Sequence, residues 1–272
     1  MNIKLKTITT TALLVIPVLL VIFNAIPLIN GILLFPFAFT IILLAKTEDQ
    51  TKEKLRLLSL LSIATLLGFF IAIFRPEGFN YPLILSLSDL NKEGNPFELY
   101  ANLSKAFGAY LVILWFVDKY LKDRDPNSES LSAYLLSKSP TVVISILSVF
   151  VFAILFFDLD WNPKYTDKII LFAFTNLFIS VLAEEAFFRL LLYNHICKLF
   201  NSNMTGTIVA LAITSILFAA SHTLPTSSLF FLYLFTGFVY AYVYKKTSSF
   251  IASVSTHWGV NLIHITLFEY PL

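Results

Sequence analysis

The segment that decides how this chain folds is IILFAFTNLFISVLAEEAFFRLLLYNHICKLF, residues 169–200. A helix needs about 20 predominantly apolar residues to cross a bilayer, and this run is longer than that. Its middle part also contains three charged side chains, Glu184, Glu185 and Arg189. A charge at membrane depth costs roughly 2.5–3.5 kcal/mol on insertion scales, so such residues indicate a functional site by default. The run therefore predicts a membrane-spanning helix that carries part of a site.

The composition of the whole chain agrees with a membrane protein. Of its 272 residues, 57% are hydrophobic and 13% are charged, whereas a soluble domain has about 25% charged residues. The net charge of +2 is too small to predict nucleic-acid binding. Cys197 is the single cysteine, which argues against a disulfide framework and a thiolate metal cluster. We expect no cofactor and no resident metal.

Apolar segments recur along the chain at lengths that suit membrane helices. They lie at 8–28, 31–45, 56–74, 100–118, 140–157, 169–193, 204–222, 227–244 and 248–268. The second is short, and Pro27, Asn30 and Gly31 leave almost no loop before it, so it is either half of a tight hairpin or a re-entrant piece. We predict an all-α, polytopic membrane protein with about eight or nine transmembrane helices and a polar site inside its C-terminal helical core.

Lysine and arginine predict the orientation, because both are enriched in cytoplasmic loops. With a cytoplasmic N-terminus, thirteen of these residues fall on the cytoplasmic side and four on the opposite side. The thirteen are Lys4, Lys6, Lys46, Lys52, Lys54, Arg56, Lys119, Lys122, Arg124, Lys138, Lys198, Lys245 and Lys246. The four are Arg75, Lys92, Lys164 and Lys168. We expect a cytoplasmic N-terminus and a prokaryotic cell membrane as the location.

The chain divides into two parts by the placement of its polar residues. Residues 1–138 carry most of the charged loops and are expected to form N-terminal transmembrane helices. Residues 139–272 carry the polar motifs and all four histidines, and are expected to form the catalytic helical core. DRDPNSES at 123–130 is typical of a flexible linker, and 75–97, with its prolines and glycines, of an irregular loop.

The acidic motif contains a candidate ion pair and one further carboxylate. Glu185 and Arg189 are four residues apart, so they share a helix face and can form a structural ion pair. Glu184 projects about 100° away from Glu185 around the helix, and the neighbouring turns offer it no partner. A buried carboxylate of this kind is a candidate general base. Lys105, near the end of the fourth span, is expected to extend to the lipid headgroups.

Two further motifs contain histidine. Phe218 and His222 end the span 204–222, which Pro225 terminates. His257 and Asn261 share one face of the last span, and a stripe of polar residues on a membrane helix points away from lipid. Alternatively, His257 and Asn261 form hydrogen bonds to neighbouring helices and have only a structural role. His264 lies near the same face and is not placed in the site, and His195 is expected at the surface.

These motifs resemble those of the CAAX protease and bacteriocin-processing family of intramembrane glutamic endopeptidases, also called the Abi family. The family pattern is EExxxR, FxxxH and HxxxN, and the residues here are, in order, Glu184, Glu185 and Arg189, then Phe218 and His222, then His257 and Asn261. The stretch GFVYAYVYKKTSSFIASVSTHWGVN, from Gly237, is also similar. The resemblance covers roughly 140–272 and does not extend to 1–138.

The resemblance implies an endopeptidase that uses no covalent intermediate and acts on a membrane-associated peptide or protein, including prenylated ones. Glu184 would take a proton from a water molecule, and His222 would hold that water. His257 and Asn261 would donate hydrogen bonds to the developing oxyanion. Glu185, Arg189 and Phe218 would support the site. Glu184 and His222 must then meet, so the helix at 204–222 is expected to tilt or to end at mid-depth, followed by irregular backbone that lines a cavity.

Two other classes of protein stay open. A zinc metalloprotease could use His222, His257 and Glu184 as ligands, although the chain has no HExxH and the third group on the His257 face is a carboxamide. A non-catalytic membrane protein, such as a bacteriocin-immunity factor, a scaffold or a small-solute transporter, could also bury polar residues. Transporters often show repeated halves, and the sequence shows no repeat.

Overall fold

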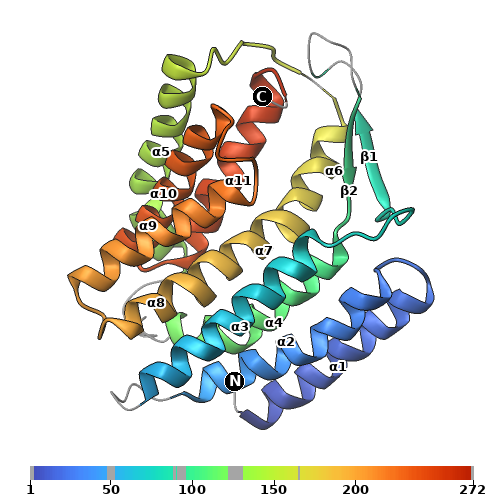
Figure 1. The fold of residues 1–272 in the computed structure, drawn as a ribbon. Coiled ribbons are helices and arrows are strands. Elements are labelled where there is room, and N and C mark those ends of the chain that lie inside the picture. The colour runs from blue at the N-terminus through green and yellow to red at the C-terminus, as the bar shows by residue number, and fades with distance from the viewer. Residues whose placement is uncertain are drawn as a thin grey trace. The chain divides into compact units, whose positions relative to one another are not determined.

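The structure, a computed structural model, describes residues 3–47, 53–87, 90, 96–121, 131–164 and 166–270 (Figure 1). The predicted linker at 123–130 lies outside these residues, as do Lys52, Lys92, Lys122 and Arg124. The described helices are α1 (Ile3–Ile22), α2 (Leu28–Lys46), α3 (Lys54–Ile73), α4 (Leu103–Leu121), α5 (Leu131–Phe156), α6 (Lys168–Thr175), α7 (Leu182–Glu185), α8 (Asn194–Leu199), α9 (Met204–Ala220), α10 (Leu229–Thr247) and α11 (Phe250–Leu267), with the π-helical segments η2 (Asn176–Val181) and η3 (Ala186–Tyr193).

The prediction of an all-α integral membrane protein is confirmed. Within the described residues, four helical stretches are long and apolar enough to cross a membrane, at Leu28–Lys46, Lys54–Ile73, Leu136–Phe156 and Lys168–Leu199. Shorter apolar helices lie at Ile8–Ile22, Leu103–Phe116 and Met204–Ala220. Each predicted span contains a helix or a continuous helical stretch. The count of eight or nine spans and the orientation stay predictions.

The stretch 75–97 differs from the irregular loop that its prolines and glycines predict. It contains β1 (Leu83–Leu87), which pairs with β2 (Phe97–Tyr100) in a two-stranded sheet. Leu85 and Leu87 alternate along β1 and are buried with Phe172 of α6 and Ile265 of α11. Alternation with a period of two is the pattern of a strand that covers an apolar surface on one face. The apolar surface that orders this strand is supplied by residues far along the chain.

The contacts divide the chain into two compact units. The first consists of Met1–Leu83, Tyr100–Lys119 and Phe178–Ala210, and the second of Ile84–Leu99, Tyr120–Leu177 and Leu211–Leu272. The motif residues Glu184, Glu185 and Arg189 belong to the first unit, and Phe218, His222, His257 and Asn261 to the second. The predicted division near residue 138 falls within α5 and stays a prediction.

In the first unit, α1 and α2 form a tight hairpin (Figure 1). A Cβ at Gly31 would lie 2.5 Å from Cγ2 of Val21, so only glycine permits this approach. Asn30, which is fully buried, donates through Nδ2 to the carbonyls of Ile71 and Phe74 and lies within 3.3 Å of the Ser104 hydroxyl. The carbonyls at the end of α3 have no partner within their own helix. Asn30 therefore joins α2 to the end of α3 and the start of α4.

In the second unit, α5, α10 and α11 pack side by side (Figure 1). Phe152 of α5 stacks on Phe235 of α10 with ring centroids 4.2 Å apart. The turn between α10 and α11 is short because Ser248 adopts a left-handed conformation, with φ at 51°. The side chain of Ser249 then accepts a hydrogen bond from the backbone N–H of Ala252. This N-cap satisfies an otherwise unpaired amide and sets where α11, the helix that carries His257, begins.

Candidate active site

The helix that carries Glu184 contains two π-helical segments. Helical structure is continuous over Lys168–Leu199, and η2 and η3 flank the four residues of α7, Leu182–Glu185. Both motif carboxylates therefore lie between π segments. Such segments are rare and are frequently found at functional sites. Hydrophobic periodicity does not reveal them, because a wider turn changes no residue type.

The predicted ion pair between Glu185 and Arg189 is confirmed. Nε of Arg189 donates to Oε2 of Glu185 over 3.0 Å, and neither side chain has any exposed surface. Removing either partner would leave an uncompensated buried charge, which is strongly unfavourable. The pair joins α7 to η3 and fixes the helix on which Glu184 lies.

The expectations for Glu184 and Lys105 need correction. Lys105 of α4 does not extend to the headgroups: its Nζ lies 2.9 Å from Oε1 of Glu184. Glu184 therefore has a cationic partner, and this partner comes from a different helix. The two residues are 79 positions apart in the sequence, and no local pattern connects them. The structure thus places a cation beside the acidic motif of the first unit.

Phe218, His222 and His257 come together in the second unit. Phe218 is 2% and His257 3% exposed, and their ring centroids are 5.7 Å apart. The His222 ring lies 4.4 Å from the Phe218 ring and stacks at 4.7 Å on Tyr233 of α10. Phe218, a plain core aromatic in isolation, is thus the common neighbour of both motif imidazoles.

His222 lies two residues beyond the end of α9, in a segment of turns at 221–228. Its Nδ1 lies 2.8 Å from the Phe218 carbonyl. A carbonyl oxygen only accepts, so Nδ1 carries the proton and the lone pair of the neutral ring is on Nε2. His222 is exposed. Its Nε2 is therefore an acceptor for a donor such as water.

The ring of His257 is held by α10, which sequence reasoning did not place in the site. Tyr240 stacks on His257 with ring centroids 4.4 Å apart. A Cβ at Gly237 would lie 2.9 Å from Cδ1 of Phe218, so the absence of a side chain there makes room for Phe218. Tyr233, Gly237 and Tyr240 have the i, i+4, i+7 spacing of one helix face, and this spacing is the signal that could have identified them.

Asn261 lies one turn beyond His257 on α11. Its Nδ2 donates to Oδ1 of Asn176 over 3.2 Å, and Asn176 is buried at the start of η2. His264 is bound elsewhere, with Nε2 3.0 Å from the carbonyl of Glu269. The polar residues on α11 thus have different partners. His264 lies outside the imidazole cluster, and the sequence analysis likewise does not place it in the site.

The surface position expected for His195 is wrong. Its side chain is 1% exposed, Nδ1 lies 2.6 Å from the Leu191 carbonyl, and its ring contacts Phe116 of α4 edge-on at 4.8 Å. The polar neighbours of His195 in the sequence suggest solvent, but α4 covers this face. Across the described ranges, no three His, Cys, Asp or Glu side chains are grouped as metal ligands.

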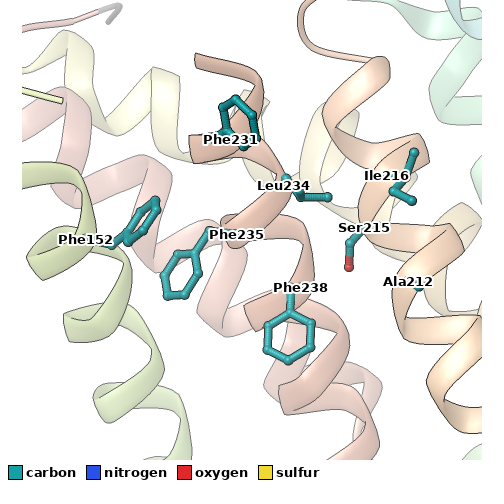
Figure 2. A pocket seen from close by; sticks show the side chains of 8 residues that line it. All are labelled: Phe152, Ala212, Ser215, Ile216, Phe231, Leu234, Phe235 and Phe238. Carbon is teal, nitrogen blue, oxygen red and sulfur yellow. The ribbon is translucent and has the colours of Figure 1, made fainter. Parts of the chain in front are cut away.

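An open apolar pocket, called the cavity below, has a volume of about 490 Å³ and lies between α5, α9 and α10 in the second unit (Figure 2). Its lining is Phe152, Ala212, Ser215, Ile216, Phe231, Leu234, Phe235 and Phe238. The single hydroxyl among them, on Ser215, donates to the carbonyl of Leu211. The cavity therefore suits a hydrocarbon group. Helix α10 presents Phe231, Phe235 and Phe238 on one face, and Tyr233, Gly237 and Tyr240 on another.

The fold and the motifs define an integral membrane protein with two carboxylates on α7, one imidazole just beyond α9, and an imidazole and a carboxamide on α11. Residues 166–263 match the family model described as type II CAAX prenyl endopeptidase Rce1-like. The resemblance to the CAAX protease family that the three motifs indicate is therefore confirmed over this segment. No curated protein and no solved structure matches the chain.

Proposed function

We propose that this protein is an intramembrane endopeptidase that cleaves a peptide bond of a membrane-associated substrate with a water molecule activated by Glu184. His222 holds this water through Nε2. The water attacks the scissile carbonyl directly, and its proton passes to Glu184. His257 and Asn261 donate hydrogen bonds to the developing oxyanion, where fixed donors contribute most to rate. The core at 139–272 carries three motifs and the N-terminal helices support it.

The observation that carries the proposal is the arrangement of the two imidazoles. His222 and His257 both pack against Phe218, and Tyr233 stacks on His222 as Tyr240 does on His257. Groups held in this way are preorganised, which is the condition for efficient positioning of water and oxyanion. If the two histidines had only a structural role, neither imidazole would need a second aromatic ring packed against it. The family match over 166–263 supports the same reaction.

We propose that the substrate carries an apolar group, such as a prenyl chain, near the bond that is cut. The cavity beside α10 has the size and the apolar lining that such a group requires. A ligand pocket is usually lined by apolar and aromatic side chains. Substitution of Phe235 by Glu should then raise KM for a farnesylated peptide more than for the same peptide without the lipid.

The proposed reaction is tested in host cells that carry the wild type, Glu184→Gln, His257→Ala or, as the control, His264→Ala. Each variant is first shown to accumulate in the membrane. The peptide termini of the membrane proteome are then compared. We expect the same termini to disappear in the first two variants and to persist in His264→Ala, and those termini identify the substrate. Unchanged termini in all variants, with a persisting phenotype, would instead favour a scaffold or an immunity factor.

The zinc alternative is separated by metal removal. Prolonged treatment of the purified protein with a strong chelator should leave cleavage of a farnesylated CAAX peptide unchanged, because Glu184 and the imidazoles act on water directly. A loss of cleavage that added Zn²⁺ restores would support the metalloprotease instead.

A further inference from the structure

Lys105 lies outside residues 166–263, the segment that matches the family model. Its Nζ is nevertheless 2.9 Å from Oε1 of Glu184, and the two side chains are 23% and 16% exposed. Glu184 is the residue to which the proposed mechanism assigns the proton of the attacking water. A lysine in direct contact with that carboxylate therefore bears on the chemistry, and it comes from the part of the chain that shows no family motif.

The position of Lys105 is fixed by its own hydrogen-bond network. Oδ1 of Asn102 accepts from the backbone N–H of Lys105 over 3.0 Å, which caps the start of α4. Nδ2 of the same Asn102 donates to the carbonyl of Ala72 over 2.7 Å. One side chain therefore caps α4 and attaches it to the end of α3. Lys105 lies in the first turn of α4, where this attachment sets the direction of its side chain.

The motif cation on the helix of Glu184 is engaged by the other motif carboxylate. Arg189 is bonded to Glu185 at 3.0 Å within a fully buried pair. A carboxylate with little exposed surface loses hydration, and burial favours its protonated form. A protonated carboxyl group cannot take a proton from water. An adjacent ammonium offsets the lost hydration of the anion, since opposite charges interact strongly where water is scarce.

We propose that Lys105 is a positioning residue for Glu184: it keeps the carboxylate ionised and fixes its orientation through Oε1. This inference rests on the proposed role of Glu184 as general base. Lys105 contacts no reacting atom and acts only through Glu184. The N-terminal helices thereby contribute to the reaction itself and are more than a membrane anchor for the core.

The activity test uses a farnesylated CAAX peptide with a fluorophore and a quencher, cleaved by the full chain in liposomes. In Lys105→Met, which keeps the length and removes the charge, kcat should fall about tenfold or more while KM stays within about twofold, because substrate contacts are unchanged. Lys105→Arg, which keeps the charge, should recover most of the loss. Lys168→Met is the matched control, since the ammonium of Lys168 donates to the Ser86 carbonyl, and its kcat should stay unchanged.

Coupling to Glu184 separates positioning from a structural role. In a Glu184→Gln background, Lys105→Met should cause no further loss, because two residues that act as a unit are not additive. An equal loss in both backgrounds, or a loss of kcat in Lys168→Met as large as in Lys105→Met, would overturn the proposal.

Infrared spectroscopy tests the ion pair without any cleavage. The difference spectrum between the chain and its Glu184→Gln variant isolates the bands of the Glu184 carboxyl group. We expect carboxylate bands in the wild type and in Lys105→Arg, and the carbonyl band of a protonated acid in Lys105→Met. Carboxylate bands in Lys105→Met would contradict the role of Lys105. If the wild type leaves the peptide intact while these bands change as expected, the proposed function fails and the ion-pair role stands.

Discussion

The imidazole of His257 lies almost parallel to the phenol ring of Tyr240, with centroids 4.4 Å apart and an interplanar angle of 20°. Phe218 contacts both rings edge-on, at 5.7 Å from His257 and 5.8 Å from Tyr240. Two aromatic rings, one from α9 and one from α10, therefore fix the plane of this motif side chain on α11. This arrangement explains how a histidine with a flexible side chain can keep one orientation in an apolar surrounding.

Loss of the ring at Tyr240 should impair catalysis through His257. We expect Tyr240→Leu to lower kcat by roughly 10- to 100-fold, since small misplacements of a catalytic group have effects of this size. Tyr240→Phe keeps the stacked ring and should retain most of the activity. The measurement is kcat and KM for a farnesylated CAAX peptide. Equal losses in the two variants would show that the hydroxyl, and not the stacking, matters.

A side chain at Gly237 should displace Phe218. The Cβ of Gly237→Ala would lie within 3.1 Å of three Phe218 atoms, and overpacking a filled core costs about 1–3 kcal/mol. We expect a lower midpoint of thermal unfolding in detergent and a loss of activity, because Phe218 also contacts both imidazoles. Gly108→Ala is the control: its Cβ would meet Phe37 at 3.6 Å, an ordinary contact. Comparable destabilisation by both changes would contradict the crowding argument.

Breaking the buried pair between α7 and η3 should destabilise the protein strongly. Arg189→Met leaves Glu185 as an uncompensated buried charge, with a typical cost of about 3–5 kcal/mol. The double variant Glu185→Gln/Arg189→Met should regain part of this loss. Arg56→Met removes an exposed pair with Glu53 and should cost less than about 1 kcal/mol. Denaturant unfolding in detergent gives the free energy of unfolding of the wild type and of these three variants. A small effect of Arg189→Met would contradict the role of the pair in stabilising this helix.

The proposed mechanism requires Glu184 and His222 to lie on either side of one water molecule. In a chain with Cys197→Ala, Glu184→Cys and His222→Cys, a short thiol-specific cross-linker should join the two positions. A protease site introduced at 201–203, in the turn between α8 and α9, reveals the link as fragments that stay together on a denaturing gel. The control pairs Glu184→Cys with His264→Cys and should not link. Efficient linking of the control alone would rule out the shared water.

The polar network around Asn30 illustrates why sequence reasoning succeeded for helices and failed for partners. Proline, asparagine and glycine near position 30 indicated a short connection, which the tight α1–α2 hairpin confirms. The side chain of Asn30 nevertheless bonds to Ile71 and Phe74, 41 and 44 positions away. Similarly, the i, i+4 spacing of Glu185 and Arg189 identified their pair, whereas no spacing could associate Glu184 with Lys105.

Sequence alone determined the class of this protein: apolar runs longer than a bilayer requires, three ordered motifs, and the face shared by His257 and Asn261. Each of these is a property of neighbouring residues, because helical geometry relates positions three or four apart without reference to the rest of the chain. Only the tertiary structure decided that Lys105 contacts Glu184, that His195 is buried, that β1 and β2 form a sheet, and which rings hold His222 and His257. These depend on side chains distant in the sequence, whose contacts exist only when helices pack.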